Sequence, residues 1–121
     1  MPETEVSIFC DESGASPLIA WLDALPATVQ DKCIVRIERL KEMGHELRRP
    51  EADTLKNGIY ELRTAFQRVQ YRVLYFFAGR LHAVLTHGLI KESRVPEKEI
   101  EFAMACRDQY GQEPQKHTYG G

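Results

Sequence analysis

Apolar and polar residues alternate along three consecutive stretches in the middle of the chain, between residues 58 and 91. A period of two is typical of β-strands with one buried face. Short polar sequences separate the stretches, and we expect two-residue hairpin turns at Gln67-Arg68 and at Gly79-Arg80. The pattern therefore predicts three antiparallel strands in a row.

Apolar residues recur at helical spacing in three other segments. Residues 16–25 and 26–44 meet at Pro26, which ends one helix and begins the next, so they predict a helical hairpin. Residues 95–111 predict a last helix. A shorter alternating segment, residues 4–11, predicts one more strand before the hairpin.

The predicted order of elements is β-α-α-β-β-β-α. It indicates an α+β fold, in which an antiparallel sheet carries an N-terminal helical hairpin and a C-terminal helix on one face. Residues 45–58 are predicted to be a polar connection, and residues 1–111 to form a single domain. Residues 112–121 have no apolar period and are predicted to form a flexible C-terminal tail.

The composition fits one ordinary globular domain, with 121 residues of which 43% are hydrophobic and 28% charged. No apolar run approaches the roughly 20 residues needed to cross a bilayer, and the acidic N-terminus lacks the basic start of a signal peptide. We therefore expect a cytoplasmic protein with no membrane partner. The three cysteines are widely spaced and form no CxxC pair, which argues against a disulfide framework and against a metal site. No cofactor is expected.

The formal net charge of −2 hides an uneven distribution. Residues 56–94 carry seven Lys and Arg against two Glu, a net charge of +5, whereas the segments on either side are acidic. A basic middle in an acidic chain indicates that one face of the protein meets an anion.

The basic residues of the strands line up when the predicted turns set the register. Arg63 then faces Arg72, Arg72 faces His87, and Lys91 lies just beyond the third strand. Like charges directly opposite each other destabilise a strand pair by up to about 1 kcal/mol. The only nearby carboxylate is that of Glu61, on the same strand as Arg63.

Two interpretations of this row of basic residues stay open. An anion can sit over it, and a phosphate matches the forks of paired arginines best. Alternatively, Arg63 and Arg72 lie at a sheet edge and reach water or pair with helix carboxylates.

The sequence resembles a known toxin family at these residues. The strings "LKNGIYELR", "YRVLYFF" and "HGLIKES", followed by the helix entry "EIEFA", resemble the HigB-like, phage-derived branch of the RelE/ParE superfamily of type II toxin–antitoxin systems. The resemblance runs from about Val6 to Tyr110. It implies a RelE-like fold and a ribosome-dependent, metal-independent mRNA endonuclease that arrests translation, in which the neighbouring 2′-hydroxyl attacks the scissile phosphate.

The resemblance also implies roles for individual residues. Arg72 matches the most characteristic catalytic arginine, which holds the scissile phosphate, and Arg63 supports the same or a neighbouring phosphate. Lys91 lies where the superfamily places a basic residue near the leaving oxygen. His87 is the best available general base, because imidazole titrates near neutral pH. Three further basic residues are predicted to bind substrate: Lys56, Arg68 and Arg94.

The sequence departs from the RNA-cleaving branch at two places. Glu61 stands where that branch has a lysine, and Val95-Pro96 stands near its tyrosine. Two other functions are therefore considered: a ParE-like toxin that poisons DNA gyrase without catalysis, and a non-catalytic domain that binds RNA or a partner. A toxin implies a cognate antitoxin, commonly a helix-turn-helix protein for HigB-like members. The nuclease would also have the ribosome and mRNA as partners.

Overall fold

The computed structural model describes residues 3–120 and confirms the α+β class. The elements are β1 (Glu5–Ile8), α1 (Pro17–Asp23), α2 (Ala27–Met43), the short 3-10 helix η1 (Gly44–Glu46), β2 (Ala52–Lys56), β3 (Ile59–Phe66), β4 (Val69–Phe77), β5 (His82–Ile90) and α3 (Glu97–Gln112). No helix formed by these residues has the length and apolarity that a membrane span requires.

The five strands form one sheet in the order β1-β5-β4-β3-β2. The prediction of a purely antiparallel sheet is wrong for β1, which pairs in parallel with β5. The sheet also contains β2, a strand inside the predicted polar connection. The missed signal was Asn57-Gly58: both residues have positive φ, and such a turn joins a strand on each side of it.

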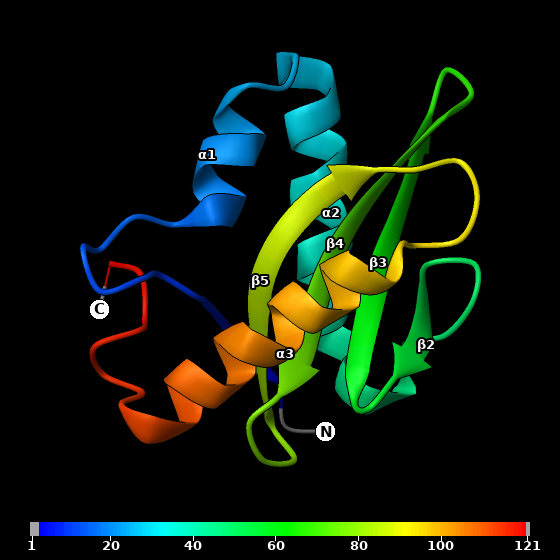
Figure 1. The fold of residues 1–121 in the computed structure, drawn as a ribbon. Helices are drawn as coiled ribbons and strands as arrows, with labels where there is room; N and C mark the ends of the chain where they lie inside the picture. The colour runs from blue at the N-terminus through cyan, green and yellow to red at the C-terminus, as the bar shows by residue number, and fades with distance from the viewer. Residues whose placement is uncertain (1–2, 121) are drawn as a thin grey trace.

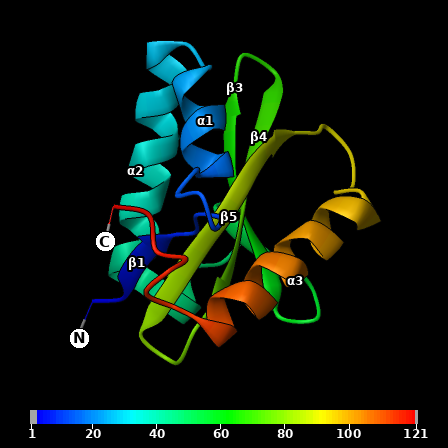
Figure 2. The same ribbon diagram turned by 60° about the vertical axis from the view of Figure 1, so that its left-hand side comes forward.

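Helices cover both faces of the sheet, with α1 and α2 on one side and α3 on the other (Figures 1 and 2). The prediction that all helices share one face is wrong. The cause is visible in β4, which is apolar on both faces. Tyr71, Val73 and Tyr75 pack with α1 and α2, whereas Leu74 and Phe76 pack with α3. Alternation along β4 therefore places its apolar side chains in two cores, one on each face of the sheet. Arg72, the basic residue of β4, lines a cleft.

The helix boundaries follow local sequence signals. The Ser16 hydroxyl accepts a hydrogen bond from the Ile19 N–H (3.2 Å), and proline occupies the first position of α1. Helix α2 ends at Gly44, which has a φ of 55°. Proline also precedes α3, and Glu97 and Glu99 lie in its first turn, where carboxylates favour the helix dipole.

The predicted register of β3 and β4 is confirmed. The turn at Gln67-Arg68 has positive φ at both residues (50° and 68°), as a type I′ hairpin requires. Arg63 consequently lies opposite Arg72. On the other face of the pair, the rings of Tyr60 and Tyr75 stack with centroids 5.4 Å apart.

The predicted register of β4 and β5 is wrong. The chain between these strands closes with a hydrogen bond from the Ala78 N–H to the His82 carbonyl, so the loop has one more residue than a two-residue turn. A β-bulge adds a second shift between Leu74 and Tyr75. As a result, His87 faces Leu74 rather than Arg72.

The segment after α3 packs along β1, although residues 112–121 were predicted to be a flexible tail. Phe9 and Thr118 form an antiparallel bridge. The His117 ring is buried and stacks on Phe9 with centroids 5.4 Å apart, and its Nδ1 lies 2.8 Å from the Cys10 carbonyl oxygen. One bridge and one stacked ring leave no periodic signal in a sequence, so the pattern did not predict this contact.

A close contact between α1 and β5 gives a stability prediction. The Trp21 ring lies against the backbone of Gly88, and a Cβ at Gly88 would overlap that ring. We expect Gly88→Ala to lower the free energy of unfolding by about 1–3 kcal/mol, as overpacking usually does. Gly111→Ala is the matched control, because nothing beyond the backbone of its own helix lies within 4 Å of its Cβ position, and it should stabilise by about 0.5–1 kcal/mol. Equal effects of the two variants in denaturant unfolding would contradict this account.

Candidate functional site

A cleft of about 520 Å³ opens between the β2–β3–β4 end of the sheet and the start of α3. It lies on the α3 face, and residues 93–95 form part of its wall. Its charged lining comprises four cations and three carboxylates: Lys56, Arg63, Arg72, Arg94, Asp53, Glu61 and Glu97. All four cations are residues that the sequence predicted for the site.

Arg72 is the most buried cation in the cleft, with 7% of its surface exposed. Its Nη1 donates a hydrogen bond to Glu61 Oε1 (2.6 Å). Its Nε donates to the Lys91 carbonyl (2.8 Å) and its Nη2 to the Ser93 carbonyl (3.1 Å). Arg72 therefore fastens the segment that follows β5 to the sheet.

Glu61 is the counter-ion shared by the two facing arginines. It is 1% exposed and accepts hydrogen bonds from Arg72 and from Arg63 Nε (3.0 Å). Glu61, the only nearby carboxylate in the sequence, thus lies on the same face two residues from Arg63 and pairs with both arginines. A buried charge needs such a partner to remain ionised at acceptable cost.

Asp53 adds a second carboxylate that sequence reasoning missed. Strand β2 places it opposite Glu61, and its Oδ2 lies 3.3 Å from Arg63 Nη2 and 2.9 Å from Arg49 Nη2. Burial raises the pKa of the Asp53 carboxyl, but hydrogen bonds from Arg49 and from the Thr54 N–H, with the charges of Arg49 and Arg63, bring the pKa below its usual value. Asp53 is therefore ionised at neutral pH.

The remaining two cations lie nearer to solvent. Lys56 forms an ion pair with Glu97 of α3. Arg94 is exposed, and its guanidinium has no hydrogen-bond or ion-pair partner among residues 3–120. The cleft thus combines a fixed arginine, two paired cations and one cation without a protein partner.

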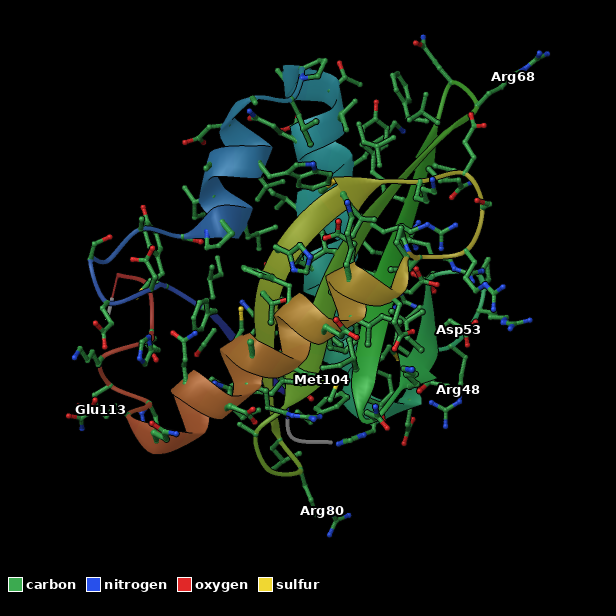
Figure 3. The ribbon with its side chains drawn as sticks, in the orientation of Figure 1. Arg48, Asp53, Arg68, Arg80, Met104 and Glu113 are labelled. Atoms are coloured by element: carbon green, nitrogen blue, oxygen red, sulfur yellow. The ribbon has the colours of Figure 1, made fainter. Side chains whose placement is uncertain are left out.

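Three of the predicted site residues, Arg68, Lys91 and His87, lie outside the cleft. Arg68 projects from the tip of the β3–β4 hairpin, far from Asp53 and β2 (Figure 3). Lys91 is exposed just after β5 and does not line the cleft, although its carbonyl accepts the hydrogen bond from Arg72. The predicted register placed Arg68 in the turn between β3 and β4. A side chain at the tip of this long hairpin cannot reach the cleft, which lies toward the other end of the hairpin.

Comparison with known families gives one match. The model of the phage-derived Gp49-like proteins (DUF891) matches residues 20–107, well over half of the chain. The chain belongs to the Gp49-like family. This family is toxin-like and related to RelE and HigB, so a Gp49-like protein implies a cognate antitoxin as partner. No curated protein matches the sequence significantly.

His87 of this Gp49-like protein lies away from the arginine row. It lines a separate hollow together with Trp21, Glu99 and Phe102. Its Nε2 lies 2.9 Å from Glu99 Oε1, and its Nδ1 lies 3.0 Å from the Thr86 hydroxyl oxygen. Both ring nitrogens are therefore engaged. The longer β4–β5 loop and the bulge together move His87 out of register with Arg72, which explains why it does not join the cleft as the sequence predicted.

The environment of His87 predicts a pH effect on the stability of the Gp49-like fold. Burial lowers the pKa of His87 below 6.5, although the Glu99 carboxylate opposes that shift. The unfolded chain therefore binds more protons, and stability falls as the pH drops below about 6.5. We expect the wild type to lose more free energy of unfolding than His87→Gln between about pH 7.5 and pH 5.5. Parallel pH profiles in urea unfolding would show that His87 does not contribute.

Among residues 3–120 of the Gp49-like protein, no three His, Cys, Asp or Glu side chains gather as a metal-ligand group. The three cysteines are free and buried. Burial raises the pKa of the Cys106 thiol to about 12, which makes it a poor nucleophile.

Proposed function

We propose that this protein is the toxin of a type II toxin–antitoxin system, of the HigB-like kind, and that it acts as a ribosome-dependent endonuclease on mRNA. The observation that carries the proposal is the convergence of Lys56, Arg63, Arg72 and Arg94 on one cleft. Membership of a toxin-like family related to RelE and HigB supports it. The ribosome and mRNA are the proposed partners besides the antitoxin.

In the proposed reaction, the 2′-hydroxyl attacks the adjacent phosphorus and the bond to the 5′ oxygen breaks. The 2′-hydroxyl loses a proton and the leaving oxygen gains one. The protein contributes positioning and charge stabilisation at the phosphate, which account for much of the catalysis in reactions of this kind.

Arg63 and Arg94 are the proposed phosphate contacts, because their guanidinium groups are the more accessible ones. Arg72 is proposed to hold the phosphate from the floor of the cleft and to position the segment from Lys91 to Ser93. Lys91, on that segment, is proposed to act at the leaving oxygen. The proposal assigns no proton transfer to His87, whose ring nitrogens are both engaged outside the cleft.

The experiment that tests the function class is induced expression with mapping of transcript 5′ ends. We expect growth arrest and new cuts inside translated frames with the wild type, and loss of both with Arg63→Ala. Arg80→Ala is the matched control, since it removes an exposed arginine at the β4–β5 turn, far from the cleft (Figure 3). Arrest without cuts would instead support gyrase poisoning. A folded protein that causes no arrest would support the binding domain.

A further inference from the structure

The carboxylates of the cleft differ in how firmly they are held. The Glu61 side chain is 1% exposed, whereas the Asp53 side chain, on the edge strand β2, is 18% exposed. Asp53 also contacts Arg49, whose side chain is 74% exposed. The Asp53 contact with Arg63 is at 3.3 Å, longer than the 2.6 Å between Glu61 and Arg72. Asp53 can therefore leave Arg63 at much lower cost than Glu61 can leave Arg72.

A similar pair lies at the opposite wall of the cleft. Glu97, at the first turn of α3, pairs with Lys56 at the end of β2, and about half of each side chain is exposed. Three cations of the cleft can be reached by an anion from solvent, and two of them, Arg63 and Lys56, are each paired with a carboxylate that is at least partly exposed. Arg94 has none among the described residues.

We propose that Asp53 and Glu97 are intramolecular counter-ions that an incoming ligand must displace, and that they restrict the cleft to RNA strands carrying several phosphates. This inference rests on the proposed function. A single phosphate that binds at Arg63 or at Lys56 must displace a carboxylate that is already held there at high local concentration. A strand that presents neighbouring phosphates displaces both carboxylates in one binding event, because the second contact is intramolecular once the first has formed. Asp53 and Glu97 therefore favour the binding of a strand with several phosphates over the binding of a single phosphate.

The test uses a short fluorescein-labelled oligoribonucleotide in which every ribose is 2′-O-methylated, so that binding occurs without cleavage. Fluorescence anisotropy at low salt compares the wild type with Asp53→Asn and Glu97→Gln. Each variant is expected to bind about 1.5- to five-fold more tightly, the range expected for removing one competing ion pair. The inhibition constant of inorganic phosphate, obtained from competition with the labelled strand and corrected for the affinity of that strand, should be lower for Asp53→Asn than for the wild type.

Glu113→Gln is the matched control for net charge, because Glu113 is exposed and lies at the far end of α3 from Asp53 (Figure 3). It should leave the affinity at the wild-type value. An equal gain with Glu113→Gln, an unchanged or weaker affinity with Asp53→Asn, or no binding by any variant would each overturn the inference. Thermal unfolding of each variant confirms that it is folded.

Binding and cleavage are measured separately, so the two proposals can fail independently. A wild type that makes no cuts in translated mRNA contradicts the nuclease, whereas the order of affinities for the methylated strand still decides the role of Asp53 and Glu97.

Discussion

Arg72→Ala is expected to lower the free energy of unfolding by about 3–5 kcal/mol, the usual cost of leaving a buried charge without its partner. The variant would strand Glu61, which is 1% exposed, with the longer contact to Arg63 alone. It would also release the carbonyls of Lys91 and Ser93 from the sheet. Denaturant unfolding monitored by circular dichroism measures the loss.

Two further variants show whether the buried charge is the cause. Arg80→Ala removes an exposed arginine and should change the free energy of unfolding by no more than about 0.5 kcal/mol. The double variant Glu61→Leu/Arg72→Leu removes both charges and should recover a large part of the stability lost in Arg72→Ala. If the double variant is less stable than Arg72→Ala, the stranded carboxylate does not explain the loss.

This result affects how toxicity data are interpreted. A loss of growth arrest in Arg72→Ala can arise from unfolding as well as from a missing phosphate contact. Arg63 separates the two, because Arg63→Ala leaves Glu61 paired with Arg72 and leaves Asp53 paired with Arg49.

Arg63→Ala is expected to reduce the rate of mRNA cleavage by about 10²- to 10³-fold, the effect of removing one preorganised donor to developing charge. Its free energy of unfolding should fall by no more than about 1 kcal/mol, because Arg63 itself is partly exposed and Glu61 keeps its ion pair with Arg72. The rate of appearance of new 5′ ends in a reconstituted translation reaction measures the first effect, and urea unfolding the second.

Arg63→Lys refines this prediction. Lysine keeps the charge but loses the two-pronged geometry of guanidinium, so its cleavage rate should lie between those of Arg63→Ala and the wild type. Wild-type cleavage by a folded Arg63→Ala protein would remove Arg63 from the reaction. Arg80→Ala should cleave at the wild-type rate.

Local pattern was enough to predict several parts of this structure. The hairpin turn at Gln67-Arg68 fixes the partner of every residue in β3 and β4, so the opposition of Arg63 and Arg72 followed from counting residues. The stack of Tyr60 on Tyr75 followed from the same count. Helix starts at proline were equally local.

Other parts depended on contacts that no local pattern encodes. The β4–β5 loop and the bulge each shift the register by one residue, and no residue type marks the bulge, so the position of His87 relative to Arg72 was mispredicted. Strand β2 is short and polar, because it lies at the edge of the sheet, and edge strands lack the apolar alternation of central ones. Asp53 was missed for that reason.

The sequence by itself determined the three α-helices, four of the five strands and the pairing of β3 with β4, and it included the four cations that line the cleft among seven predicted site residues. These depend on spacing along the chain and on turn geometry, which are local. Only the tertiary structure decided which carboxylates meet those cations, that α3 covers the opposite face from α1 and α2, and that His87 lies in a separate hollow. These depend on where distant segments meet. The charge state of a site is therefore set by neighbours in space, and Asp53, Glu61 and Glu97 reach the arginines and the lysine from three different elements.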